Sequence, residues 1–101
     1  MHLIEILLPL TDNAGTPFGP ELFAQIRREL TERFGGLTAF SRAPAQGLWK
    51  DERETKHDDI VVFEVMADTL DTEWWRDYRQ SLERRFRQDA IVARAVAVTR
   101  L

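Results

Sequence analysis

The segment DDIVVFEVMA, residues Asp58 to Ala67, is the most strand-like stretch of the chain. From Ile60 to Val65 its residues are β-branched or aromatic except for Glu64, so apolar side chains occupy both faces. A continuous apolar run of this length is typical of a central strand that is covered on two sides. We therefore place this segment inside a sheet and work outward from it along the chain.

The strand before it is predicted over residues 37–43, at an edge of the sheet, because Pro44 cannot donate a hydrogen bond to a neighbouring strand. Between the two strands lies a charged stretch, residues 50–59, where a hairpin needs its tip. We interpret this stretch as a solvated tip. A metal or acid–base site requires side chains that converge from fixed elements, whereas His57, Asp58 and Asp59 are consecutive and diverge. We therefore expect it to bind no metal.

Two amphipathic helices are predicted, over residues 20–34 and 72–88. Pro20 suits the first turn of the first helix, and Gly35-Gly36 supplies its left-handed end. Asp71 or Thr72 caps the second helix. Apolar residues recur at three- and four-residue spacing in both, as expected of one buried face: Leu22, Phe23, Ile26, Leu30 and Phe34, then Trp75, Tyr78, Leu82 and Phe86.

The remaining strands are predicted at the two ends of the chain, over residues 2–10 and 90–100. The element order is therefore βαββαβ. With right-handed crossovers, this order places two helices on one face of a four-stranded antiparallel sheet in the order 4-1-3-2. We expect an α+β, ferredoxin-like fold that fills residues 1–101 as a single domain, since single cores typically take roughly 100–150 residues.

Composition narrows the classes of function. The 101 residues carry 14 Lys and Arg against 17 Asp and Glu, a net charge of −3 that argues against a nucleic-acid partner. The chain has no cysteine and no glycine-rich phosphate loop, and its two histidines form no catalytic triad. We predict no cofactor. The opening MHLIEILLPL is too short for a membrane span and lacks the features of a signal peptide, so we expect a cytoplasmic protein.

Strand alternation predicts which side chains face away from the helices. In the last strand, alanines alternate with larger residues, and small alanines suit the side on which helices press against the sheet. The opposite face then carries apolar residues from all four strands, more than a monomer normally exposes. A second copy of the chain would cover this face economically. We predict a homodimer that covers Leu7, Phe40, Val62 and Val96.

The same face is predicted to carry four charged residues, Arg94, Glu5, Glu64 and Arg42, in the order of the strands across the sheet. Two carboxylates on central strands, each with an arginine outside it, allow two interpretations. They form salt bridges within a dimer interface, since buried charges are retained when paired. Alternatively, they form a polar patch in an apolar cavity that binds a small ligand. Trp49 is a further candidate for ligand binding, by stacking.

Two short motifs carry a resemblance to a known family. Gly47-Leu48-Trp49 follows the second predicted strand, and Arg85-Phe86-Arg87-Gln88-Asp89 ends the second helix. With the apolar strand between them, these residues resemble a family of short bacterial α+β domains of unknown function. The layout is also similar to dimeric α/β-barrel proteins, which include small monooxygenases and ligand-binding modules. The resemblance implies the fold and no particular chemistry.

Two classes of function follow. The first is a dimeric module that binds a small molecule or a protein partner through the open face of its sheet. The second is a small cofactor-independent enzyme of the monooxygenase or isomerase kind. Titratable groups that face an enclosed pocket favour the enzyme, whereas a flat and fully packed contact between sheets favours the module.

Overall fold

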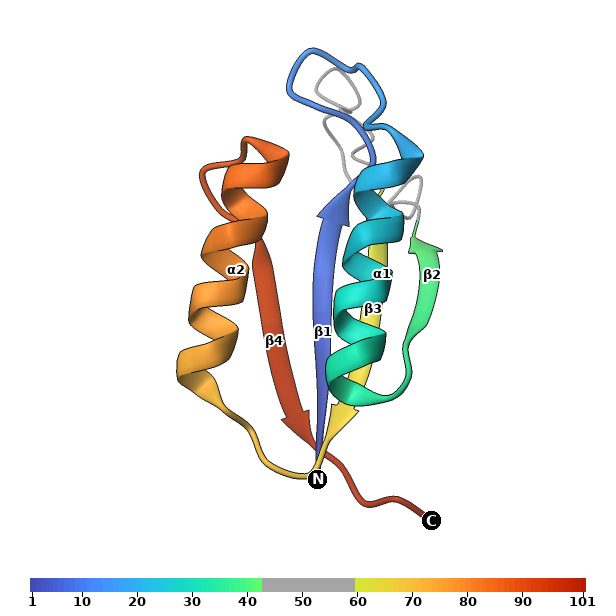
Figure 1. Cartoon of the computed structure of the whole chain (residues 1–101), viewed down its shortest axis with the longest axis vertical. Helices are drawn as coiled ribbons and strands as arrows, with labels where there is room; N and C mark the ends of the chain where they lie inside the picture. Colours follow the sequence, from blue (N-terminus) through green and yellow to red (C-terminus); the bar gives the residue numbers. More distant parts are fainter. Residues whose placement is uncertain (43–59) are drawn as a thin grey trace, which may run out of the picture.

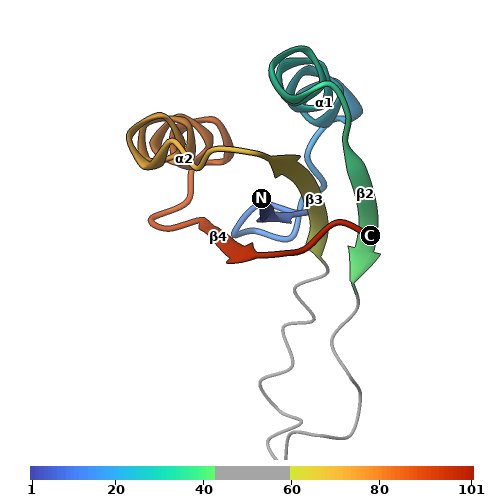
Figure 2. The ribbon, with the colours of Figure 1, turned by 90° about the horizontal axis from the view of Figure 1, so that it is seen from below.

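The computed structural model describes residues 1–42 and 60–101, with the backbone alone at residues 41 and 42. In chain order its elements are β1 (His2–Pro9), α1 (Pro20–Phe34), β2 (Thr38–Arg42), β3 (Ile60–Ala67), α2 (Thr72–Phe86) and β4 (Val92–Ala97). The strands form one antiparallel sheet in the order β2-β3-β1-β4, and both helices lie on the same face of it (Figures 1 and 2). The ferredoxin-like βαββαβ fold and the strand order predicted from the sequence are confirmed.

The helices begin and end for local reasons. α1 starts at Pro20 and ends where Gly35 takes a left-handed conformation with φ of 80°, its N–H donating to the carbonyl of Thr31 at 2.8 Å. At the start of α2, the Asp71 carboxylate accepts from the backbone N–H of Trp74 at 3.0 Å. α2 ends at Phe86, two residues before the predicted end, because Arg87 adopts the left-handed conformation with φ of 51° although it is not a glycine.

The core lies between the helices and the sheet. Alternate residues of β1 and β3 point into it, and the helices contribute the apolar stripes predicted from their spacing. Each of these large side chains contributes about 1.5–3 kcal/mol when fully buried. The buried residues of the core are Ile4, Ile6, Leu8, Phe63, Val65, Phe23, Ile26, Leu30, Trp75, Tyr78, Leu82, Phe86 and Ile91.

The opposite face of the sheet carries no helix in the described part of the chain (Figure 2). Its large apolar residues are partly open to solvent: Phe40 is 41% exposed, Met66 and Val96 are 50% exposed and Val92 is 51% exposed. Val62 lies on the same face but is fully buried within the chain. Contrary to the expectation from sequence, Val62 needs no partner copy to cover it.

Candidate functional site

The register of the sheet brings three charged residues into one row on the helix-free face. Glu5 of β1 lies directly opposite Glu64 of β3 on one side and opposite Arg94 of β4 on the other. The fourth place in this row, on β2, belongs to Thr38, which pairs with Glu64. We call these four residues, Thr38, Glu64, Glu5 and Arg94, the charged row.

The sequence does not fix the register of the four charged residues, and in the structure Arg42 is not level with Glu64. Arg42 pairs with Ile60, four residues away from Glu64 along β3, which is about 13 Å at the usual rise of a strand. The alternation of β2 places the backbone position of Arg42 on this face, as predicted. The pairing of β2 with β3 decides which residue of β3 it lies opposite. In the register of the described strands, the two carboxylates therefore do not lie level between two arginines.

The charges in the row are unevenly compensated. The Arg94 guanidinium donates from Nε to Glu5 Oε1 at 3.1 Å. Glu64 makes no ion pair with any of the described residues. Burial raises the pKa of the Glu64 carboxyl above its ordinary value, and the neighbouring Glu5 carboxylate raises it further. The row thus holds two carboxylates and one arginine, and Glu64 is the group that a proton, a cation or a hydrogen-bond donor would stabilise.

Apolar side chains border the charged row on both sides. In the direction of the chain start, Leu3 of β1 pairs with Met66 and Val96. In the other direction, Leu7 of β1 pairs with Val62 and Val92, and Phe40 continues that row on β2. The polar groups are therefore enclosed within an apolar surface, and a partner that covers this surface would also shield the carboxylates from water.

Two hollows reach this face. One, of about 510 Å³, is lined by Glu64 and Thr38 of the charged row together with Leu3, Met66 and Arg100. The other, of about 670 Å³, lies at the opposite end of the sheet between Leu7, Val92 and the loop after β1. In that loop the Asp12 carboxylate accepts from the backbone N–H groups of Ala14 and Thr16, both at 2.9 Å. Both hollows have the volume of ligand sites, and both are open to solvent.

Several residues singled out from the sequence lie outside the described part. Trp49, with the Gly-x-Trp motif, belongs to this group, and so does the charged tip at 50–59. The stacking role of Trp49 and the absence of a metal at the tip therefore stay predictions. Among residues 1–40 and 60–101, no three His, Asp or Glu side chains lie in an arrangement that would hold a metal ion.

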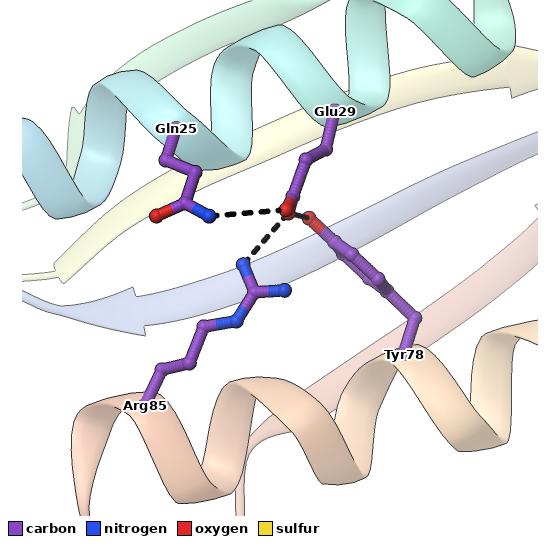
Figure 3. A network of polar contacts seen from close by, with 4 residues as sticks. All are labelled: Gln25, Glu29, Tyr78 and Arg85. Atoms are coloured by element: carbon purple, nitrogen blue, oxygen red, sulfur yellow. Dashed lines mark hydrogen bonds and ion pairs between the residues drawn. The ribbon is translucent and has the colours of Figure 1, made fainter.

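A polar network that the sequence did not predict joins the two helices (Figure 3). Glu29 of α1 accepts from the Tyr78 hydroxyl at 2.9 Å and from Arg85 Nη1 at 2.7 Å, both on α2, and from Gln25 at 3.5 Å. Burial alone would raise the pKa of Glu29, but the hydrogen bonds from Arg85 and Tyr78 outweigh it and lower that pKa. Burial and the adjacent Glu29 raise the pKa of Tyr78. The network connects the helices and leaves Glu29 well paired.

The chain has a structural relative among known proteins. Its fold is similar to that of a phage SAM lyase solved in complex with S-methyl-5'-thioadenosine, with a TM-score of 0.59 over 94% of this chain and 79% of that one. The two sequences are 13% identical, so the likeness concerns the fold. No family model and no curated protein sequence matches the chain. Within the described residues, neither helix is long and apolar enough to cross a membrane.

Proposed function

We propose that this chain is a homodimeric module that binds a small molecule through the helix-free face of its sheet. The observation that carries the proposal is the charged row, in which Glu64 has no ion pair with any described residue while apolar residues border it. Such a surface combines hydrophobic contact with a few polar groups that select a ligand. A second copy is the simplest cover for it, because a two-fold interface uses one patch twice.

Association through this face has a favourable driving force. Phe40, Met66, Val92 and Val96 are half exposed, and burying apolar surface contributes about 25 cal/mol per Å². Part of this gain offsets the lost freedom of two separate chains. The carboxylates near the contact then need compensation, which Arg94 provides for Glu5. The Glu64 carboxylate is compensated by the ligand or by a hydrogen-bond donor from the partner copy.

The fold of the structural relative supports ligand binding in a general way. A protein of similar fold was solved with S-methyl-5'-thioadenosine, a molecule that combines a polar nucleoside with an apolar thioether. The hollow beside Glu64 likewise combines apolar walls, from Leu3 and Met66, with a carboxylate and a hydroxyl. S-methyl-5'-thioadenosine is therefore a reasonable first probe for this chain.

The dimer is tested by analytical ultracentrifugation at micromolar concentration. The wild type should sediment as a dimer, and Val96→Asp should sediment as a monomer, because an unpaired carboxylate would be buried at the contact. Val96 suits this test better than the fully buried Val62, whose replacement would also unfold the chain. Ala39→Asp is the matched control, since Ala39 is exposed on the helix side of β2. A monomeric wild type would refute the dimer.

The ligand is tested in two steps. Native mass spectrometry of the purified protein shows whether a small molecule is carried along. Calorimetry with S-methyl-5'-thioadenosine then compares the wild type with Glu64→Gln, for which we expect at least about tenfold weaker binding, equivalent to about 1.4 kcal/mol. Glu32→Gln, on the exposed side of α1, serves as the control. A dimer that carries no ligand and binds no probe would retain the interface but remove the small-molecule site.

A cofactor-independent enzyme is the second candidate. The observation in its favour is that Glu64, a carboxyl with a raised pKa, lines the hollow of about 510 Å³. A carboxyl that keeps its proton to a higher pH than usual suits general acid–base chemistry. SAM is the first substrate to test, by following its consumption with the wild type and with Glu64→Gln. Turnover that Glu64→Gln abolishes favours the enzyme, and binding without turnover favours the module.

A cytoplasmic location and the lack of a nucleic-acid partner stay predictions from composition. The absence of cysteine is consistent with the first, and a net charge of −3 is consistent with the second.

A further inference from the structure

β4 lies at an outer edge of the sheet. Within the described residues β4 pairs only with β1, and the pairing runs without a bulge from His2 and Ala97 to Leu7 and Val92. The strand contains no proline and a single charged residue, Arg94. Natural sheets usually protect such edges with charges, prolines, bulges or a covering segment, because unpaired N–H and C=O groups accept further strands.

α2 extends over this edge. Figures 1 and 2 both place α2 beyond β4, on the side away from β1. On the side of the sheet that faces the helices, β4 presents only alanines, and Ala95 and Ala97 remain exposed. Small side chains below an overhanging helix leave a space that none of the described residues fills.

The space is a groove of about 280 Å³ between α2 and β4. Ile4, Leu70, Trp75 and Ala95 form its apolar walls. Among the described residues, the charged ones that line it are Arg76, Arg79 and Arg94, and no Asp or Glu does. Of the two groove arginines on α2, Arg76 is the more accessible, with 58% of its side chain exposed. Its ion pair with the exposed Glu73 is long, at 3.8 Å. Such exposed pairs contribute little stability and exchange readily.

We propose that an extended segment of a partner protein joins the β4 edge as a fifth strand beneath α2. Main-chain hydrogen bonds to β4 supply affinity, and alternate side chains that enter the groove supply specificity. The segment that fits carries a bulky apolar residue to contact Trp75 and Leu70, and an acidic residue near it to pair with Arg76. This surface lies on the helix side and edge of the sheet, and it shares only Arg94 with the charged row on the face assigned to the homodimer.

A second copy of the chain does not fit this edge. Two β4 strands paired about a two-fold axis would lie about 4.8 Å apart. Each α2 extends beyond its own β4 (Figures 1 and 2), so this pairing would bring both helices to the same side of the joined edge, whereas packed helices require about 8–10 Å between their axes. A lone extended segment avoids this clash. The overhang therefore selects a peptide over a second copy.

The test begins with a phage-displayed library of random octapeptides selected on the intact wild-type protein. Enriched sequences should combine a bulky apolar residue with Asp or Glu at a nearby position. The most enriched peptide is then synthesised, and its addition should shift the backbone amide NMR signals of residues 92–97 and of the first turns of α2. No enrichment, or shifts confined to Phe40, Met66 and the rest of the helix-free face, would overturn the proposal.

Two pairs of variants examine the groove with the same peptide. Ala95→Phe fills the groove and should weaken binding at least about tenfold, whereas Ala39→Phe, the same change on the other edge strand, should leave binding unchanged. Arg76→Glu should also weaken binding about tenfold, and the control Arg84→Glu, on α2 but outside the groove, should not. Equal affinity of all four variants for the peptide contradicts the proposal. Self-association of the wild type that Ala95→Phe abolishes also contradicts it, because the β4 edge would then pair with a second copy of the chain.

Discussion

Replacing Tyr78 by Phe isolates one contact between the helices. The variant keeps the buried ring and removes only the hydroxyl that donates to Glu29 at 2.9 Å. A hydrogen bond to a charged acceptor contributes about 1.5–3 kcal/mol when buried. Here the Glu29 side chain is 32% exposed and keeps its bond from Arg85 at 2.7 Å, so water and Arg85 compensate part of the loss. We expect the free energy of unfolding to fall by about 1 kcal/mol.

For a domain of this size, about 1 kcal/mol corresponds to a melting temperature lower by about 4–8 °C. The assay is thermal and urea unfolding followed by tryptophan fluorescence and circular dichroism. All variants are compared at one protein concentration, because dimerisation would make the transition depend on concentration. A double-mutant cycle with Glu29→Gln assigns the loss to the pair, since the two changes should then combine to less than their sum.

The pH dependence gives an independent check. The folded pKa of Glu29 lies below its unfolded value, so its contribution is complete above the unfolded pKa and is lost as the pH falls through the folded pKa. The difference in stability between the wild type and Tyr78→Phe should therefore be largest near neutral pH and should shrink well below pH 4.5. An unchanged melting temperature in Tyr78→Phe, or an equal loss at pH 7 and pH 3, would refute this account of the network.

Three further substitutions test single features. Glu64→Gln should stabilise the folded chain by roughly 0.2–1 kcal/mol at neutral pH, because it removes a carboxylate opposite Glu5. Because the folded pKa of Glu64 is raised, the wild type becomes more stable as the pH falls through that pKa. The extra stability of Glu64→Gln over the wild type, measured by urea unfolding, should therefore vanish in acid. Asp71→Ala should lower the free energy of unfolding by about 0.5–2 kcal/mol, because it removes the side chain that accepts from the Trp74 N–H at the start of α2. Asp71→Asn should leave it nearly unchanged, since asparagine also caps helices. Equal losses for the two variants in thermal unfolding would exclude a capping role. Gly35→Ala should lower the stability by about 1–2 kcal/mol, because φ there is 80° while nothing lies within 4 Å of an added Cβ. Gly36→Ala is the control, and similar melting temperatures for the two variants would contradict the argument from backbone conformation.

The sequence by itself determined the elements and the faces of this protein. Pro20 and the spacing of Phe23, Ile26 and Leu30 predicted α1 with its observed bounds, because helical periodicity and end signals are local properties of the chain. Alternation likewise assigned Glu5, Glu64 and Arg94 to the helix-free face, since a strand places successive side chains on opposite sides whatever its neighbours are. The strand order then followed from the sequence of elements and the handedness of their connections.

Only the tertiary structure decided which side chains meet. Glu5 faces Glu64, and Arg42 lies four residues away from that level, because register depends on pairing between strands that are distant in the chain. Glu29 meets Tyr78 and Arg85, 49 and 56 residues later, because the two helices pack side by side. The position of α2 over the edge of β4 likewise depends on packing. Periodicity encodes the direction of a side chain, whereas its neighbours depend on contacts between elements that are far apart in the sequence.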